Sequence, residues 1–222
     1  MHSFPIYYDE SRPVDDVVSI AVAPIDSFSG RVSTRPLVVE IDGMRAVPRR
    51  NLSGLWVFLN LPVQPEYKIR INAGMAGYFD PPVTTFPPNP ATGNEPRLDV
   101  YLHRRPEFPF DPGTTLVSGQ LVVNTDEPVP DGLIRADLPM VPAGTPPFVT
   151  RTDMNGSFAL PLRMPADLLP TDLVTFTFVA GAMVRNFQKF VREDVRSTFK
   201  KPIQMDGLNT PDLKAFAGDP VP

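Results

Sequence analysis

The chain has 222 residues, a hydrophobic fraction of 42% and a formal net charge of −4 at pH 7. This length accommodates two domains of about 100 residues, each able to bury a core without disulfides or metals. The mild charge, with Lys and Arg scattered singly or in pairs, excludes the basic surface that nucleic-acid binding requires. The absence of cysteine excludes disulfides, thiolate nucleophiles and cysteine-ligated metal centres.

Proline is the dominant compositional signal, with 29 residues in the chain, more than twice the usual share of about 5%. Because proline lacks the N–H that helix interiors require, this density indicates short strands joined by rigid loops. No stretch approaches the length of about 18 apolar residues that a membrane span needs. Residues 1–16 lack a basic region followed by an apolar run, so we expect cytoplasmic synthesis without a signal peptide.

Alternation of apolar and polar residues predicts strands throughout residues 1–105, with turn residues between them. Asp42-Gly43 is a dipeptide favoured in hairpins, so residues 44–47 are expected to return and pair with the preceding strand. Residues 80–96 show no periodicity and are expected to form a loop. The predicted strands span residues 17–22, 37–41, 55–59, 67–71 and 98–102.

A short proline-rich segment, residues 105–113, is expected to be a stiff linker. Alternating segments resume after it, and Gly54 and Gly156 occupy corresponding positions before strands that contain phenylalanine. We therefore expect an all-β fold with two tandem Ig-like or transthyretin-like β-sandwich domains. The domains would span residues 1–105 and 114–222, with the linker at 106–113. The strands predicted in the second domain are 116–123, 132–138, 148–152, 157–160, 172–179, 187–191 and 195–200.

The second half carries a set of recognisable motifs. Gly119 lies in its first strand, residues 128–132 form a turn, and residues 152–158 read Thr-Asp-Met-Asn-Gly-Ser-Phe. With Ala180-Gly181 after a later strand, these residues resemble the carboxypeptidase regulatory-like domain, a β-sandwich of the transthyretin type. The resemblance covers residues 116–203. It implies a hairpin at residues 152–158 with a tight Asn-Gly turn, and no catalytic role, because the module is a non-catalytic appendage in most contexts.

The catalytic branches of this fold type need residues that the chain lacks. Transthyretin-like hydrolases of ureide metabolism need several histidines and a C-terminal Tyr-Arg-Gly-Ser, and intradiol dioxygenases need two Tyr and two His around iron. This chain has only His2 and His103, and its last residues are Asp-Pro-Val-Pro. His103 has no visible partner as a general base and is expected to be exposed at a strand end. The sequence predicts no enzyme, no catalytic residue and no cofactor.

Asp153 and Asn155 are spaced as in the first part of a calcium-binding loop. The twelfth position, where such a loop needs a Glu ligand, is Met164. A structural turn is therefore expected, and no metal site. Paired carboxylates of the glycosidase kind stay open as an alternative, because folding can bring acids together from separate strands.

Aromatic residues and prolines are concentrated in residues 77–88, and a loop of this kind is ordered only when it packs on something. It can pack on its own domain or form a partner surface together with the linker. Trp56, the sole tryptophan, is expected in the core; the alternative is an exposed sugar-binding platform with Tyr67 or Tyr78. The candidate partner-binding residues are Tyr78, Phe79, Phe86, Phe108 and Phe110.

These features are typical of a non-enzymatic structural protein, a subunit of a larger assembly that contacts other protein subunits or further copies of itself. A phage-tail-like contractile particle is one such setting, since small sandwich domains decorate its baseplate, cap or fibres. The alternative is a carbohydrate- or peptide-binding β-sandwich module, which predicts exposed coplanar aromatic side chains.

Overall fold

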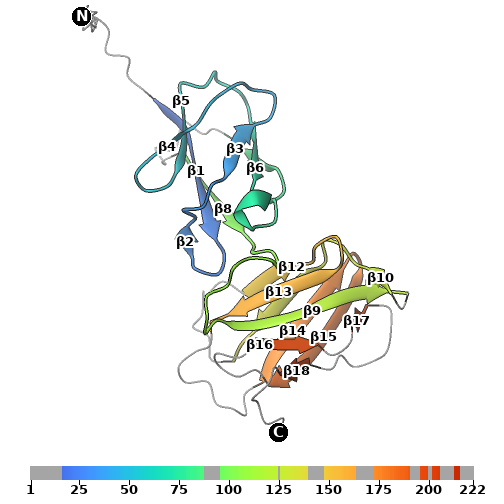
Figure 1. Ribbon diagram of the computed structural model, residues 1–222. Helices are drawn as coiled ribbons and strands as arrows, with labels where there is room; N and C mark the ends of the chain where they lie inside the picture. The colour runs from blue at the N-terminus through green and yellow to red at the C-terminus, as the bar shows by residue number, and fades with distance from the viewer. Residues whose placement is uncertain are drawn as a thin grey trace, which may run out of the picture.

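The chain folds as two groups of strands, each around its own hydrophobic core (Figure 1). The fold is all-β: no α-helix occurs in the described part of the chain, where one 3-10 turn, η1 (Gly74–Ala76), interrupts the strands. We call the groups the N-terminal half, up to Thr114, and the C-terminal half, from Thr115. The computed structural model describes residues 17–87, 96–124, 126–139, 148–163, 173–190, 196–199, 202–205 and 213–215.

The N-terminal half contains two sheets. In the larger sheet β1 is central, pairing antiparallel with β5 on one edge and parallel with β8 on the other. The smaller sheet has the order β3-β6-β7. Side chains of β6 alternate strictly between buried and exposed, as a strand with one face on the core requires. The strands are β1 (Val18–Asp26), β2 (Arg31–Val32), β3 (Val38–Ile41), β4 (Arg49–Arg50), β5 (Trp56–Leu59), β6 (Tyr67–Asn72), β7 (Thr84–Phe86) and β8 (Arg97–Leu102).

Three expectations for this half are wrong. The first predicted strand does not stop before Pro24, because β1 continues through it to Asp26. The loop predicted at residues 80–96 contains β7, which pairs with β6. The hairpin at Asp42-Gly43 is absent, because β3 pairs with β6 instead. Arg70 on β6 donates two hydrogen bonds to the Asp42 carboxylate (2.9 and 3.0 Å), which holds the end of β3 against its true partner.

The C-terminal half also contains two sheets. In one of them β9 is the central strand and pairs with β10, β13, β16 and β17. The other is antiparallel, with the order β12-β11-β14-β15. The strands are β9 (Thr115–Val123), β10 (Glu127–Pro128), β11 (Leu133–Asp137), β12 (Phe148–Arg151), β13 (Ser157–Leu162), β14 (Leu173–Ala180), β15 (Met183–Phe190), β16 (Arg196–Phe199), β17 (Ile203–Gln204) and β18 (Leu213–Ala215).

Residues 152–158 do not form the expected hairpin. The strands on either side of this turn, β12 and β13, pair with β11 and β9, which belong to different sheets. The turn therefore carries the chain from one sheet to the other. Asp153 Oδ1 accepts the backbone N–H groups of Asn155 (2.8 Å) and Ser157 (2.9 Å). Gly156 has a positive φ of 72°, whereas Asn155 does not, so the glycine alone supplies the left-handed conformation.

Phenylalanine dominates the core of the C-terminal half. Phe178 stacks on Phe187 with ring centroids 5.1 Å apart, and Phe199 meets both rings edge-on. Gly119 on β9 lies beneath this cluster. A Cβ at this position would lie 2.8 Å from Phe199 Cδ2 and 2.9 Å from Phe158 Cε1. The glycine that interrupts the predicted strand is thus needed for the close approach of two core rings.

Gly119→Ala is expected to lower the free energy of unfolding by about 2 kcal/mol, because rings in a packed core cannot yield without strain. The measurement is urea denaturation followed by circular dichroism. Gly74→Ala is the control, since its Cβ would meet nothing closer than 3.7 Å and its backbone lies outside the left-handed region. Equal stability of Gly119→Ala and the native chain would contradict the packing described.

Candidate functional site

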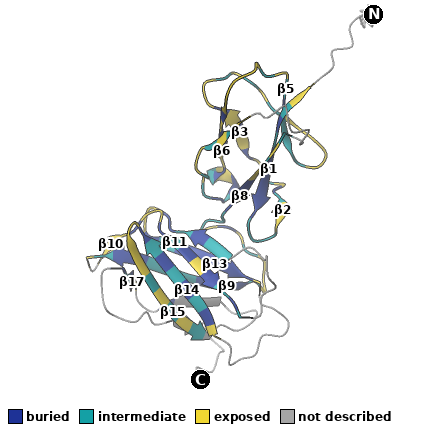
Figure 2. Ribbon diagram, turned by 180° about the vertical axis from the view of Figure 1, so that it is seen from behind, coloured by how far each residue is buried: buried dark blue, intermediate teal, exposed yellow. Residues whose placement is uncertain are grey.

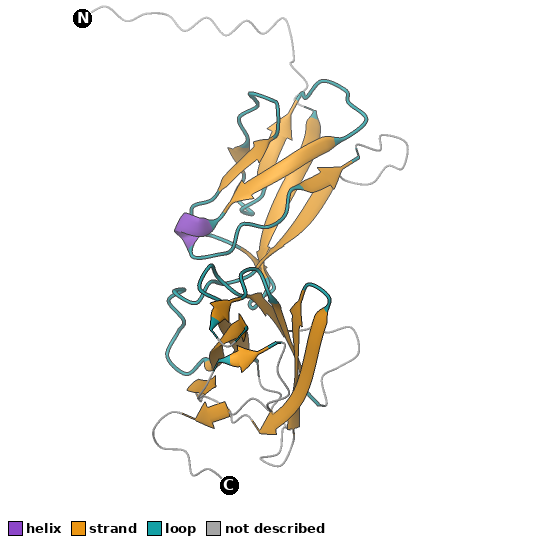
Figure 3. Cartoon of the chain, turned by 90° about the vertical axis from the view of Figure 1, so that its right-hand side faces the viewer, coloured by secondary structure: helices purple, strands orange, loops and turns teal. Residues whose placement is uncertain are grey.

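A densely hydrogen-bonded polar cluster lies where the two halves meet. β1 and β8 run parallel and both end at this junction. Asp26, the last residue of β1, turns the chain: its Oδ1 accepts the backbone N–H groups of Phe28 (2.9 Å) and Ser29 (2.8 Å). Such a turn suits an Asp whose side chain bonds backbone N–H groups two and three residues on, with Gly30 at its end. Figure 3 shows η1 at the same end of the N-terminal half.

Asp26 also forms a buried ion pair. Its Oδ2 accepts hydrogen bonds from Arg104 Nε (2.9 Å) and from the Tyr78 hydroxyl (2.8 Å). Asp26 is 4% exposed and Tyr78 2% exposed, and the Arg104 side chain is 10% exposed. Ser33 Oγ donates to the Tyr78 oxygen (3.4 Å). The carboxylate thus accepts four hydrogen bonds, the condition under which a buried charge is tolerated.

The pKa values in this cluster reflect its burial and its hydrogen bonds. Burial alone would raise the pKa of Asp26, but the hydrogen bonds from Ser29, Arg104 and Tyr78 together lower it below its ordinary value. Burial, reinforced by the neighbouring Asp26 carboxylate, raises the pKa of Tyr78. At neutral pH the carboxylate is therefore ionised and the phenol remains a hydrogen-bond donor.

Aromatic rings surround the Arg104 guanidinium. Its central carbon lies 4.7 Å from the ring centroid of Phe28, 4.3 Å from that of Phe108 and 5.7 Å from that of Phe110. Such cation–π contacts contribute most where water is excluded. Phe108 packs at 5.3 Å against both Tyr78 and Phe110. Residues 106–110, expected to form part of a linker, thus pack on the core of the N-terminal half.

The five predicted partner-binding residues do not form one surface. Tyr78 and Phe108, 2% and 8% exposed, belong to the core of the N-terminal half and pack on their own half. Phe110 is half-buried beside Phe108, and Phe79 is half-buried beneath the Arg105 guanidinium (5.8 Å). Phe86 is half-buried on β7 and packs on the core. A partner contact by Phe79, Phe86 or Phe110 stays a prediction.

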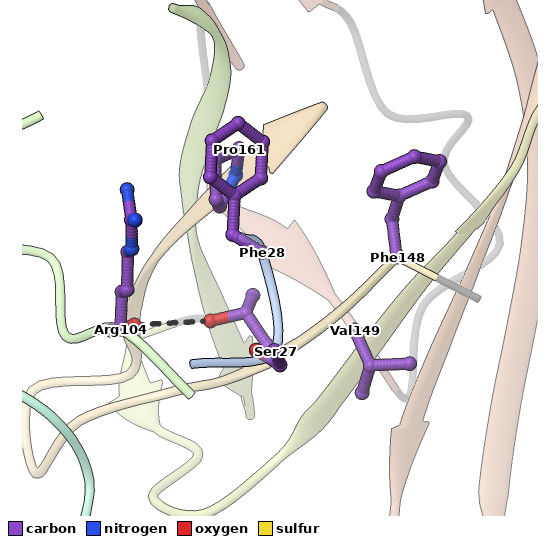
Figure 4. A pocket seen from close by; sticks show the side chains of 7 residues that line it. Ser27, Phe28, Arg104, Phe148, Val149 and Pro161 are labelled. Carbon is purple, nitrogen blue, oxygen red and sulfur yellow. Dashed lines mark hydrogen bonds between the residues drawn. The ribbon is translucent and has the colours of Figure 1, made fainter. Parts of the chain in front are cut away.

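Three contacts join the junction to the C-terminal half. His103 donates its Nδ1–H to the carbonyl oxygen of Val149 on β12 (3.1 Å), and the Thr150 hydroxyl donates to the carbonyl oxygen of Arg104 (3.4 Å; dashed line in Figure 4). The Arg163 guanidinium lies 5.1 Å from the ring centroid of Phe28. The expectation that His103 is exposed is wrong: it is half-buried between the halves, and burial followed by the charge of Arg151 lowers its pKa.

A small hollow opens between these contacts (Figure 4). The space within it is about 10 Å³, enough for little more than one water molecule. It offers no room for an organic substrate. It is lined by Ser27, Phe28, Arg104, Phe148, Val149, Thr150 and Pro161.

The proposed sugar-binding platform is not formed. Tyr67 is 3% exposed and Tyr78 2% exposed, so neither can lie beside a glycan. Trp56 is half-buried against the core of the N-terminal half, with the Arg50 guanidinium 5.8 Å from its ring. Its Nε1 has no hydrogen-bond partner among the described residues. Trp56 is expected in the core, and in the structure it is half-buried at the edge of that core.

Asp153 forms the expected structural turn, since its carboxylate caps its own backbone. No cluster of three or more His, Asp or Glu side chains suited to a metal ion is found within the described ranges. Met164, His2 and the carboxylate pairs at residues 15–16 and 193–194 lie outside those ranges. None of the helical structure in the described part is long and apolar enough to cross a membrane.

Comparison with family models, curated proteins and solved structures finds no match to the chain. Its function must therefore be inferred from the residues of the chain themselves.

The central pair of this site escaped sequence reasoning. In the sequence, residues 26–30 indicate a turn, and a basic pair such as Arg104-Arg105 at a strand end is typical of solvated side chains. The turn is confirmed, but the Arg104 side chain is nearly buried. A signal was present in the aromatic residues that follow, Phe108 and Phe110, since aromatic rings can surround a guanidinium.

Asp26→Asn is expected to lower the free energy of unfolding by about 3 kcal/mol or more, because it leaves the Arg104 charge buried without its counter-ion. Urea denaturation at pH 7 measures the loss. Asp42→Asn is the matched control: it removes the carboxylate of an exposed Arg pair and should leave stability nearly unchanged. Similar losses in both variants would contradict the special role of the buried pair.

Acid should weaken the fold in two steps. A folded-state pKa below the ordinary value means that protonation favours the unfolded chain. The stabilisation associated with His103 is complete above about pH 6.5 and declines below it; that of Asp26 is complete above about pH 4 and declines below it. We expect His103→Gln to flatten the stability profile between pH 7 and 5.5 and to leave the step below pH 4 intact. Urea unfolding across this pH range measures the profile. If stability falls between pH 7 and 5.5 in His103→Gln as it does in the native chain, the assignment of that loss to His103 is refuted.

Proposed function

We propose that the chain is a non-enzymatic structural protein that serves as a subunit of a larger assembly. The observation that carries this proposal is the buried junction. Asp26, Arg104 and Tyr78 are the groups that an active site would aim at a substrate, but here they satisfy one another. Their arrangement fixes the end of the N-terminal half from which Phe28, His103 and Arg104 contact the C-terminal half. The adjoining hollow has room for about one water molecule.

A stiff connection suits a part that must hold two contact surfaces at a set distance. Two bodies in one chain move relative to each other unless their interface is large and well packed. At this junction the charge pair and its cage of rings fix the ends of β1 and β8. Contacts from Val149, Thr150 and Arg163 continue into the C-terminal half. A flexible tether would need none of these groups.

The finer architecture is part of the same proposal. We infer that each half is a β-sandwich domain, the two in tandem, and that the second is a carboxypeptidase regulatory-like domain of the transthyretin type. Support comes from the separate cores of the two halves and from the motif residues Gly119 and Gly156, both of which occupy positions that exclude a Cβ.

The setting that we propose is a phage-tail-like contractile particle, with the protein made in the cytoplasm and then incorporated as a baseplate, cap or fibre accessory. The support for this setting is compositional: a β-rich chain with 29 prolines and no cysteine. The partners would be other protein subunits or further copies of the chain. The alternative is a carbohydrate- or peptide-binding module. It predicts exposed coplanar aromatic side chains, and Trp56, Tyr67 and Tyr78 do not form such a platform.

The proposal is tested by the native mass of the purified chain, measured by light scattering on a size-exclusion column, alone and after incubation with host lysate. A defined oligomer, or a discrete set of co-purifying proteins, would support an assembly subunit and identify its setting. A monomer that recruits nothing, together with binding in a glycan or peptide screen, would favour the alternative.

The stiffness of the junction gives a more specific prediction. Because the chain has no cysteine, spin labels can be placed on Leu52→Cys and Met154→Cys, two exposed positions in opposite halves. Pulsed electron paramagnetic resonance should give one narrow distance distribution. Arg104→Gln should broaden it, because the ends of β1 and β8 lose their common tie, whereas Arg70→Gln, in an exposed pair, should not. A broad distribution in the labelled native chain would refute the stiff connection.

A further inference from the structure

Strand β15 (Met183–Phe190) presents the longest open strand edge in the described part of the chain. It pairs with β14 over eight residues in an uninterrupted antiparallel register, and within the described residues no strand pairs with its other edge. Figure 2 shows it at the margin of its sheet, coloured mostly exposed and intermediate. The other outermost strands have two to six residues, and short edges are one way in which proteins avoid unwanted pairing.

The backbone of β15 is set up to accept a further strand. Its loop to β14 consists of Gly181 and Ala182, so Ala180 and Met183 form the closing hydrogen-bonded pair. Backbone groups then alternate, and those of Val184, Asn186 and Gln188 point away from β14. The side chains of these three residues are exposed, so nothing described covers this stretch. The strand contains no proline, although the chain has 29.

The charges of β15 indicate what kind of strand would bind. It carries Arg185 and Lys189 and no acidic residue. The Arg185 guanidinium donates to the carbonyl oxygen of Gln204, so its charge lies close to the sheet. Two β15 strands from separate copies would gather four cations at one seam, and like charges across strands are destabilising. An extended acidic segment would instead be stabilised.

The chain itself supplies such a segment in residues 1–16, which precede β1. They contain Asp9, Glu10, Asp15 and Asp16, against Arg12 as the only Lys or Arg. Residues 6–12, between two prolines, read Ile-Tyr-Tyr-Asp-Glu-Ser-Arg, a stretch whose first three residues favour strands. Seven residues match the length that the β15 edge can pair. We call residues 1–16 the acidic arm.

We propose that the acidic arm of one copy adds as a strand to the β15 edge of a neighbouring copy. The arm joins β1 at the end opposite Asp26, and Asp26 lies at the junction. The nine residues of β1 put about 30 Å between that end and the junction, beyond which the C-terminal half with β15 lies (Figure 1). Because residues 6–12 do the pairing, only residues 13–16 of the arm bridge the gap to β1, and four residues reach at most about 14 Å. The arm can therefore pair with a neighbour placed at that end, and not with β15 of its own chain.

A contact of this kind joins two different surfaces and is therefore heterologous. Such contacts generate rings when the rotation closes and open rows when it does not. Affinity would come from main-chain hydrogen bonds, as in other cases of strand addition, and the charges would favour the acidic segment. The inference rests on the proposed function, an assembly subunit, and names one contact between copies within it.

The test uses the full chain and two variants in sedimentation-velocity ultracentrifugation. One variant lacks residues 1–16 and keeps the β15 edge; the other, Asn186→Pro, keeps the arm and loses the outward N–H at the centre of the edge. The full chain is expected to associate with rising concentration, and each variant alone to stay monomeric. Mixed in equal amounts, the variants should form a 1:1 dimer, because one supplies the edge and the other the arm.

Asn186→Thr is the matched control, since it changes the same side chain and retains the N–H; it should associate like the native chain. Gln188→Pro removes the outward N–H at a second position of the β15 edge and should also prevent association. Circular dichroism is used to confirm that both proline variants fold. Raising the salt concentration should weaken association of the full chain by screening the charges.

Self-association of the truncated variant at the native level would overturn the proposal and indicate pairing of two β15 edges or another surface. A full chain that stays monomeric at every concentration, or a mixture of folded variants that forms no dimer, would overturn it as well. The proposed function is judged separately: a discrete complex with other proteins would support it even if copies of the chain never join.

Discussion

The contact on which the rest of the structure depends is the buried bond between the Asp26 carboxylate and the Arg104 guanidinium. Each charge would be costly to bury alone, and each is stabilised by the other together with the Tyr78 hydroxyl and the rings around it. The pair ties the ends of β1 and β8 at the same point. From there Phe108 returns the chain to its own core, and the turn after Asp26 brings Phe28 towards the C-terminal half. The pair thus anchors the end of the N-terminal half that contacts the C-terminal half.

Much of the fold could be predicted from the sequence, because the signal of a half-buried strand is local. β6 and β14 alternate with period two, and the structure confirms strands at both. The errors concern which strands pair. Asp42-Gly43 looks like a hairpin, yet the preceding strand pairs with β6, more than twenty residues further on. Partner choice depends on core packing between residues far apart in the chain, such as Val39 on β3 and Ile71 on β6, which no local pattern encodes.

The candidate site was less predictable, for a related reason. Arg104 and Arg105 are neighbours with the same side chain, but Arg104 meets a buried carboxylate 78 positions earlier in the chain, whereas Arg105 pairs with the exposed Glu107. A basic pair at a strand end is solvated in most proteins, so sequence alone favours the wrong environment for Arg104. Tyr78 and Phe108 illustrate the same point. They belong to an aromatic- and proline-rich part of the sequence, but both rings are buried, Phe108 against the Arg104 guanidinium and Tyr78 against Phe108.

In the described residues, the polar side chains of the junction and the backbone groups of the β15 edge differ in what they leave available for binding. At the junction, side chains that could serve a substrate are fully occupied with one another, which leaves them structural. At the β15 edge, the groups that remain available belong to the backbone, and every residue type carries them. A protein that recognises its neighbours through main-chain hydrogen bonds needs no conserved catalytic triad, ligand set or aromatic platform. Such a protein would show little functional signal in its side chains. The described residues fit that expectation, with regular strand alternation, a polar cluster whose members bond one another, and one long strand edge that no described strand pairs.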